Sequence, residues 1–137
     1  MNTYKHLLFP ILFTLLILSC SKDDDTDPLI GVWQVEQLIE NNVESALSDC
    51  FKKTTIEFKS DGTLVSINFI DEDGCRSETV NLTWNKINNN TLHITYVEDG
   101  DTDVEKYTYS ISNGKLTLDE ILDAGGTPYK LVLKKIK

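Results

Sequence analysis

From residue 32 onwards, apolar and polar residues alternate in short runs that are separated by turn-forming residues. Alternation with a period of two is typical of β-strands that bury one face, and no run shows the longer period of an amphipathic helix. The pattern therefore predicts an all-β domain built from consecutive strands. The expected strands are 32–39, 53–59, 63–70, 76–85, 91–97, 104–112, 115–118 and 129–136.

The pairing of neighbouring strands is predicted from the turns between them. Asp61-Gly62 is a strong signal for a two-residue hairpin turn, and this turn places Phe58 opposite Val65 and Ile56 opposite Ile67. The apolar residues of both strands then share one face.

Two further turns extend the same pattern. Asn113-Gly114 places Ile111 opposite Leu116 and Tyr109 opposite Leu118, and a symmetric turn over 86–90 places Trp84 opposite Leu92. Exposed sheet edges invite aggregation, so we expect the strands to close into an eight-stranded antiparallel up-and-down barrel. A two-sheet β-sandwich is the alternative.

The N-terminus carries a different pattern, an apolar run over 7–18 that follows Lys5. A membrane-spanning helix needs about 20 apolar residues, so this run suits the core of a signal peptide. Ile17-Leu18-Ser19-Cys20 resembles the bacterial lipobox, in which the cysteine is lipidated and becomes the first residue of the mature protein. The resemblance implies a signal peptide over 1–19 and a lipid anchor such as palmitate on Cys20. An ordinary cleaved signal with a chance cysteine is the alternative.

Residues 20–30 read as an acidic tether between this anchor and the domain. Ser21-Lys22-Asp23-Asp24-Asp25 resembles the export tag of surface lipoproteins from the Bacteroidetes group, which implies an outer-membrane protein exposed at the cell surface. A solvated acidic linker would show the same composition, and both interpretations can hold together.

Charge narrows the range of partners. Without residues 1–19 the chain has 12 basic and 22 acidic residues, a net charge of −10. Nucleic-acid binding needs lysine and arginine to neutralise phosphates, so we expect no nucleic-acid partner.

The cysteines fit an oxidising compartment. Of the three, Cys20 is assigned to the lipid, which leaves Cys50 and Cys75 as an even pair. Continuing the register of the 53–70 hairpin brings these two close together at its open end. We therefore expect a Cys50–Cys75 disulfide that stabilises the fold by roughly 3 kcal/mol.

The first strand adds a family resemblance. Gly31-Val32-Trp33 matches the Gly-x-Trp signature that opens the lipocalin barrel, and this signature together with 55–63 resembles the small lipocalin-like lipoproteins of the Bacteroidetes group. The resemblance covers nearly all of 29–137 and implies a lipocalin-like barrel over 31–137. The chain is shorter than true lipocalins and has no recognisable C-terminal helix.

Side chains alternate between the inside and the outside of the barrel along each strand, and this strand phase predicts how the barrel interior is divided. Large side chains gather towards the compact turns as a plug: Trp33, Phe58, Trp84, Ile111 and Leu116. Tyrosines combine apolar area with a hydroxyl, which suits a pocket for an amphipathic ligand. The residues expected at the mouth are Phe69, Tyr96, Tyr107 and Tyr129, with Arg76 and Glu78 at the rim. The alternative is a filled core, because eight-stranded barrels are just wide enough to pack solid.

The two barrel ends differ in charge. The longer loops are acidic, as in 71–73 and 98–103, and the compact end gathers Lys59, Lys86, Lys115, Lys134, Lys135 and Lys137. The tether enters at the compact end, so we expect the barrel to stand on it with the acidic loops outward. If the barrel is filled, those loops are the candidates for binding a partner protein or glycan.

Catalytic and metal-binding patterns are scarce. His93 is the one histidine of the mature chain and has outward phase, and no nucleophile, phosphate-loop or zinc motif occurs. The stretch 99–103 begins like a calcium loop, but Val104 replaces the required glycine. We therefore expect a non-catalytic protein that binds a small apolar or amphipathic ligand and has neither cofactor nor metal.

Overall fold

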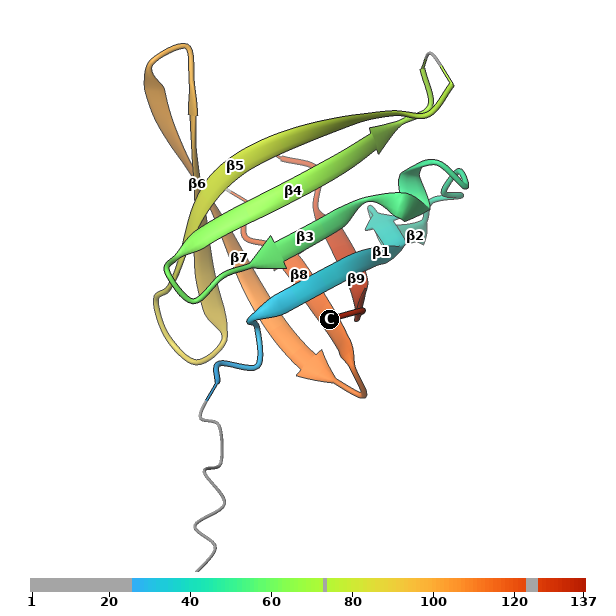
Figure 1. Cartoon of the computed structure of the whole chain (residues 1–137). Helices are drawn as coiled ribbons and strands as arrows, with labels where there is room; N and C mark the ends of the chain where they lie inside the picture. Colours follow the sequence, from blue (N-terminus) through green and yellow to red (C-terminus); the bar gives the residue numbers. More distant parts are fainter. Residues whose placement is uncertain (1–25, 73, 123–125) are drawn as a thin grey trace, which may run out of the picture.

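The computed structural model describes residues 26–72, 74–122 and 126–137. The regular secondary structure of this part of the chain is all β-strand apart from one short 3-10 helix (Figure 1). The elements are β1 (Gly31–Glu40), β2 (Val43–Glu44), η1 (Phe51–Lys53), β3 (Thr55–Phe58), β4 (Thr63–Ile70), β5 (Arg76–Lys86), β6 (Thr91–Glu98), β7 (Asp101–Ser112), β8 (Lys115–Glu120) and β9 (Tyr129–Lys135).

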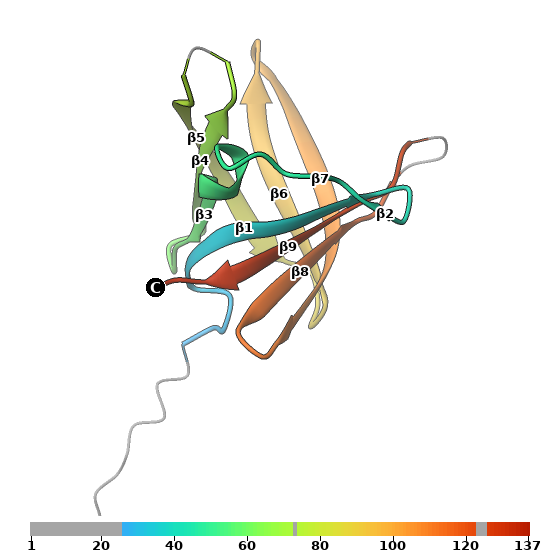
Figure 2. The same cartoon turned by 90° about the vertical axis from the view of Figure 1, so that its right-hand side faces the viewer.

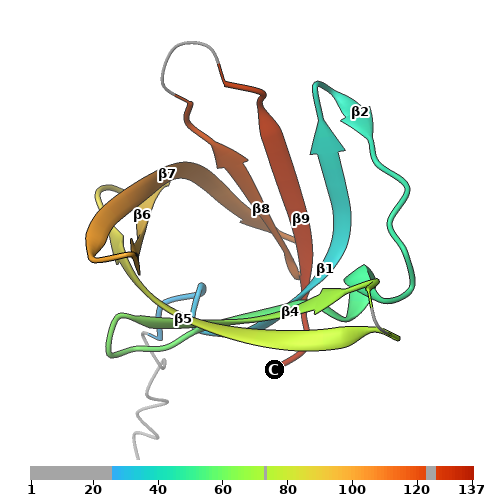
Figure 3. The ribbon, with the colours of Figure 1, turned by 90° about the horizontal axis from the view of Figure 1, so that it is seen from above.

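The long strands follow one another around a closed antiparallel barrel, and β9 returns to pair with β1 (Figure 2). This β1–β9 pairing extends from Trp33 to Glu40, so the sheet closes on itself, as the view from above shows (Figure 3). The short β2 is an addition that pairs only with the end of β1. The predicted eight-stranded barrel is confirmed, and the sandwich alternative is not formed.

The register between β3 and β4 differs by one residue from the predicted one. Phe58 lies opposite Leu64, because the Lys59 amide donates to the Thr63 carbonyl at 2.9 Å and the turn between them holds three residues. Gly62 occupies the left-handed region of this turn, with φ of 84°. A slip of one residue exchanges the faces of a strand, so Leu64 and Ser66 point inward and Ile67 is 36% exposed.

The β5–β6 ladder is also displaced, by two residues, which leaves each strand's faces unchanged. Trp84 lies opposite Ile94, and this ladder extends only from Thr83 to Lys86. Beyond it, β5 stays with β4 and β6 stays with β7, so the two hairpins splay apart (Figures 1 and 3). The β7–β8 register agrees with the predicted pairing of Ile111 with Leu116.

The end of the barrel with the compact turns is packed solid, as the predicted plug requires. The Phe58 and Trp84 rings meet edge to face, with centroids 5.3 Å apart and planes at 85°. Trp84 and Ile111 are partly buried against a fully buried set. That set comprises Leu29, Trp33, Phe58, Leu64, Leu92, Leu116, Leu118 and Leu133.

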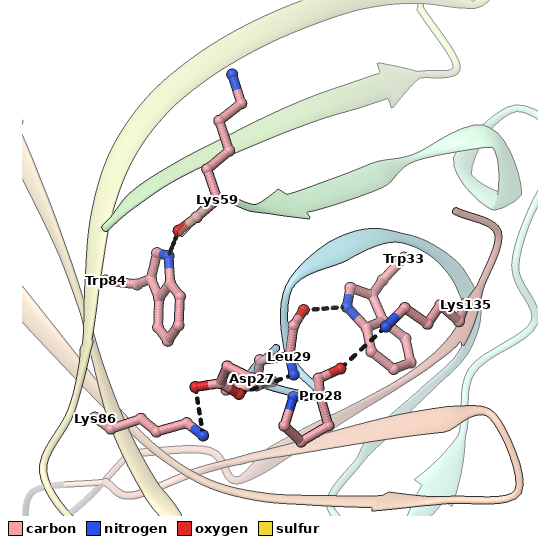
Figure 4. A network of polar contacts seen from close by, with 8 residues as sticks. All are labelled: Asp27, Pro28, Leu29, Trp33, Lys59, Trp84, Lys86 and Lys135. Carbon is pink, nitrogen blue, oxygen red and sulfur yellow. Dashed lines mark hydrogen bonds and ion pairs between the residues drawn. The ribbon is translucent and has the colours of Figure 1, made fainter. Parts of the chain in front are cut away.

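The segment just before β1 is fastened beneath this plug (Figure 4). Leu29 is fully buried, and its carbonyl accepts a hydrogen bond from the Trp33 indole nitrogen at 2.8 Å. One carboxylate oxygen of Asp27 accepts from the Leu29 amide at 3.0 Å, and the other pairs with the Lys86 ammonium at 2.6 Å. The chain therefore enters the barrel at its compact end, as predicted.

Gly31 has a structural requirement for glycine, which explains the first position of the Gly-x-Trp signature. Its φ is +132°, and a Cβ atom at this position would overlap the Lys137 carbonyl oxygen. That same oxygen accepts a hydrogen bond from the Val32 amide at 3.0 Å. The glycine thus lets the end of the chain close against β1.

The predicted disulfide is confirmed. Cys50 and Cys75 are bonded, with their Cα atoms 5.5 Å apart and 25 positions apart in the sequence. The bond ties the start of η1 to the loop between β4 and β5. It therefore lies at the open end of the β3–β4 hairpin, opposite the plug.

Residues 1–25, and with them Cys20, lie outside the described residues. The signal peptide, the lipid on Cys20 and the acidic export tag therefore stay predictions. Within the described ranges, the structure contains no helix with the length and apolar character needed to cross a membrane.

Candidate ligand-binding site

Above the plug, the barrel encloses a cavity of about 280 Å³. Its wall is mostly aliphatic, with polar groups gathered on β4, β7 and β9. The lining residues are Ile56, Leu64, Ser66, Asn68, Leu82, Ile94, Glu105, Tyr107, Leu118, Tyr129 and Leu131. A barrel filled along its whole length, the alternative for the interior, is not what the structure shows.

Two of the predicted mouth residues meet in this cavity. Tyr107 from β7 is only 4% exposed, and its hydroxyl lies 2.5 Å from the hydroxyl of Tyr129 from β9. Their rings pack edge to face, with centroids 6.2 Å apart and planes at 73°. Strand phase thus identified both residues correctly as inward-facing.

Glu105 completes this polar cluster. The Tyr107 hydroxyl donates to the Glu105 carboxylate at 2.5 Å. Because Tyr107 has one hydroxyl hydrogen and gives it to Glu105, the short contact with Tyr129 needs the Tyr129 hydroxyl as donor. The result is a chain of hydrogen bonds that runs from Tyr129 through Tyr107 to Glu105.

Both hydroxyls of this chain keep their protons at neutral pH. Burial, followed by the hydrogen bonds to Glu105 and Tyr129, raises the pKa of Tyr107 far above its ordinary value of 10.0. Burial is also the largest cause that raises the pKa of Tyr129, to about 12. The chain therefore acts as a fixed set of donors directed at one carboxylate.

Sequence reasoning missed Glu105, Ser66 and Asn68. Glu105 precedes Tyr107 by two positions on the same strand, so the period of two was a sufficient signal for it. Ser66 and Asn68 were hidden by the incorrect β3–β4 register. The Ser66 hydroxyl donates to the Asn68 side-chain oxygen at 2.7 Å, which joins the two polar groups of β4.

Phe69 is not part of the cavity wall, and its predicted inward orientation is wrong. Asn68 lines the cavity, so its neighbour Phe69 lies on the opposite face of β4. Arg76 and Glu78 share the inward phase of β5, but both are exposed at its far end and neither lines the cavity. The splay of the hairpins carries that end of β5 away from the barrel interior.

Tyr96 lies at the seam between β5 and β6. It lines a groove of about 330 Å³ with residues from both strands, among them Leu82, which also lines the cavity. Burial raises the pKa of Tyr96, and the nearby carboxylates, Asp103 first and then Glu105, raise it further. Tyr96 therefore lies near the polar cluster but does not line the cavity.

The surroundings of the cluster are acidic. Burial, and then the charge of Glu105, raise the pKa of Glu120. The described residues that line the cavity include no lysine, arginine or histidine. The electrostatic potential at this end of the cavity is thus negative.

Asp99 and Gly100 form the turn between β6 and β7, both with positive φ, and Asp101 begins β7. The stretch that begins like a calcium loop is therefore a hairpin turn. In the part of the chain that the structure describes, no three His, Cys, Asp or Glu side chains are grouped to hold a metal ion. Asp73, in the other acidic loop, lies outside the described residues.

Comparison with solved structures gives the fold of a lipocalin-like protein from Bacteroides uniformis, with a TM-score of 0.53 at 15% identity over 79% of this chain and 98% of that one. A redesigned β-barrel has a TM-score of 0.46 at 17% identity over 80% and 92% of the two chains. A mutant of the fluorescent protein UnaG has a TM-score of 0.44 at 15% identity, over 79% of this chain and 96% of that one.

No curated protein matches the sequence. The family model of the lipocalin-like domain matches residues 29–118, from the buried Leu29 to a position within β8. This match takes in the Gly-x-Trp segment and most of the barrel strands. The chain belongs to the lipocalin-like domain family.

Proposed function

We propose that this protein is a non-catalytic binding protein that holds one small amphipathic ligand inside its barrel. The supporting observation is the cavity of about 280 Å³, which is closed at one end by the plug and carries the Glu105–Tyr107–Tyr129 chain in its wall. An eight-stranded barrel is wide enough for one small ligand. The volume lies near the lower limit of about 300 Å³ for ligand pockets, so the ligand is small.

The wall supports an amphipathic ligand over a purely polar one. Six of the lining residues are leucine or isoleucine, among them Leu82 and Ile94, and they surround most of the cavity. Burying apolar ligand surface against such a wall contributes about 25 cal/mol per Å². The polar groups on β4, β7 and β9 then fix the orientation of the ligand.

Probe binding tests this function. The neutral probe N-phenylnaphthylamine should gain fluorescence on binding to the mature chain. Ser66→Leu fills the cavity from β4 and should weaken the binding by about tenfold or more, which corresponds to 1.4 kcal/mol. Thr79→Leu makes a similar enlargement at an exposed position of β5 and should leave binding unchanged. Equal binding by both variants would show that the probe is not in the cavity.

We also propose that the protein is anchored by a lipid on Cys20 to the outer membrane, with its plug end towards the bilayer. The fastening of Asp27 and Leu29 beneath the plug supports this orientation, because a short tether then begins at that end (Figure 4). Lysines at the same end, including Lys134 and Lys135, suit an anionic membrane surface. The cavity would face away from the membrane.

A Cys20→Ala variant tests the anchor. It should move the protein from the membrane fraction to the soluble fraction and abolish the incorporation of labelled palmitate. Cleavage of the wild-type protein by a protease added to intact cells would show surface exposure. Membrane association that is unchanged in Cys20→Ala would refute the lipid anchor.

A further inference from the structure

The cavity wall offers an uneven set of hydrogen-bonding groups. The hydrogen of Tyr107 goes to Glu105, that of Tyr129 goes to Tyr107, and that of Ser66 goes to the Asn68 oxygen. Each of these oxygens can still accept a hydrogen bond, because a carboxylate or hydroxyl oxygen has more than one lone pair. The polar side of the cavity therefore presents mainly acceptors.

The donors that the wall retains are the two hydrogens of the Asn68 amide. This amide carries no positive charge, so it does not neutralise the negative charge that Glu105 places in the same cavity. A ligand that brings only acceptors would leave the remaining lone pairs of the Glu105 and Tyr129 oxygens without a donor.

Cations from the surrounding strands do not compensate this charge. On β7, Lys106 lies between Glu105 and Tyr107 in sequence and so has the opposite, outward phase. On β9, Lys130 follows Tyr129 and forms an ion pair with Asp119 at 2.9 Å. The nearest lysines in the sequence thus belong to the outer surface of the barrel.

We propose that the cavity selects small amphipathic amines, with the ammonium group bound by Glu105 and Tyr129, and discriminates against carboxylates of the same size. This inference rests on the proposed function, that the cavity is a ligand site. An ammonium group has three donors and no acceptor, which complements the acceptor-rich wall. The aromatic rings of Tyr107 and Tyr129 add faces that attract a cation.

The discrimination follows from the same groups. A carboxylate ligand would place a second negative charge beside Glu105 and set acceptors against acceptors, so it would be rejected by repulsion as well as by lost bonds. A hydrogen bond to a charged group contributes more than one between neutral groups, so the amine should bind at least tenfold more tightly than the carboxylate. A neutral alcohol, which has one donor, should lie between them.

The test uses the mature chain and three ligands with the same apolar body: phenylpropylamine, phenylpropanol and phenylpropanoate. Each is titrated as a competitor against N-phenylnaphthylamine, and the amine and carboxylate are also followed by calorimetry. The expected order of affinity is amine, then alcohol, then carboxylate. A carboxylate that binds as tightly as the amine would overturn the inference without the need for any variant.

A pair of matched variants locates the preference. Glu105→Gln keeps the size of the side chain and removes its charge, so the amine should weaken by about tenfold or more while the alcohol changes little. Glu57→Gln removes a carboxylate from the outward phase of β3, where Glu57 pairs with Lys59 at 3.8 Å, and should change neither affinity. An amine preference that survives Glu105→Gln would overturn the assignment to this residue.

The two levels of the proposal can fail separately. If the neutral probe binds and Ser66→Leu blocks it, but the three head groups bind alike, only the amine preference is wrong. If the probe does not bind at all, the proposed function fails and the amine preference fails with it. Circular dichroism of each variant shows that a lost affinity is not a lost fold.

Discussion

Removing the Cys50–Cys75 disulfide should cost this barrel a large part of its stability. The bond closes a loop of 25 residues that contains β3 and β4. In the chain-entropy model, closing a loop of that length lowers the entropy of the unfolded chain by an amount worth about 3.5 kcal/mol at 25 °C. Whole domains of this size are stable by only about 5–15 kcal/mol, so the loss should be plain in an unfolding curve.

The assay is urea unfolding of the double variant Cys50→Ala/Cys75→Ala. The double variant and the protein that keeps Cys50 and Cys75 both carry Cys20→Ser, so that no third thiol interferes. Alanine suits Cys50 because this residue is only 8% exposed and an apolar replacement adds no unsatisfied group. Oxidised wild type and wild type kept in reductant provide the comparison. The free energy of unfolding should fall by about 3.5 kcal/mol in the double variant and by a similar amount on reduction. A loss below about 1 kcal/mol would refute the reasoning, because the bond would then not be constraining the unfolded chain.

Three further changes test other parts of the structure. Gly31→Ala should lower the free energy of unfolding in urea by about 1–3 kcal/mol or more. The φ of +132° is costly for alanine, and the new Cβ would overlap the Lys137 carbonyl oxygen. Raising the pH above 10.0, the ordinary tyrosine pKa, should destabilise the fold, because the pKa of Tyr129 is raised to about 12 and the unfolded chain loses this proton first. That loss should develop between pH 10.0 and about 12 and shrink in Tyr107→Phe/Tyr129→Phe, as measured by unfolding at each pH. Asp27→Asn should weaken the half-buried pair with Lys86 by up to about 1 kcal/mol and speed proteolysis just before β1, whereas unchanged cleavage would show that the pair does not hold this segment.

Much of the fold could be predicted from the sequence, because period-two alternation and turn residues are local signals. They were sufficient for the order of the strands, the closed barrel, the plug around Trp33 and Phe58, and the disulfide. The β3–β4 register could not be predicted in the same way. Asp61-Gly62 suits a two-residue turn as well as a three-residue turn with glycine in the left-handed position, and the two differ by one residue in register.

That ambiguity was resolved wrongly for a physical reason. A register that buries Val65 and Ile67 beside Phe58 covers more apolar surface than one that buries Leu64 and Ser66. The actual register places a serine and an asparagine inside the barrel, where they line the cavity. Local preference thus fails at a position where the strand lines the proposed binding site, which is where such failures are expected.

Two of the six residues predicted for the site, Tyr107 and Tyr129, line the cavity, and the other four do not. Tyr107 and Tyr129 were found because both are still paired to a neighbouring strand, Tyr107 with Leu92 and Tyr129 with Glu40, so the alternation of inward and outward side chains holds there. Tyr96, Arg76 and Glu78 lie where the β5–β6 ladder has already ended, and there phase no longer says what a side chain faces. The end of that ladder depends on the packing of the whole barrel and leaves no local signal in the sequence.

The plug and the cavity depend on each other. Trp33, Phe58 and Trp84 concentrate the large side chains at one end of the barrel, where the β5–β6 ladder is complete. With the core supplied there, the other end does not need to be filled, and the ladder can stop after Thr83 without loss of the fold. The inward positions that line the cavity then carry Ser66, Asn68 and Glu105, which are too small or too polar to pack a core. The plug that stabilises the fold and the cavity proposed to bind a ligand are therefore separate parts of the barrel, so substitutions at Ser66 or Glu105 should alter affinity far more than the free energy of unfolding.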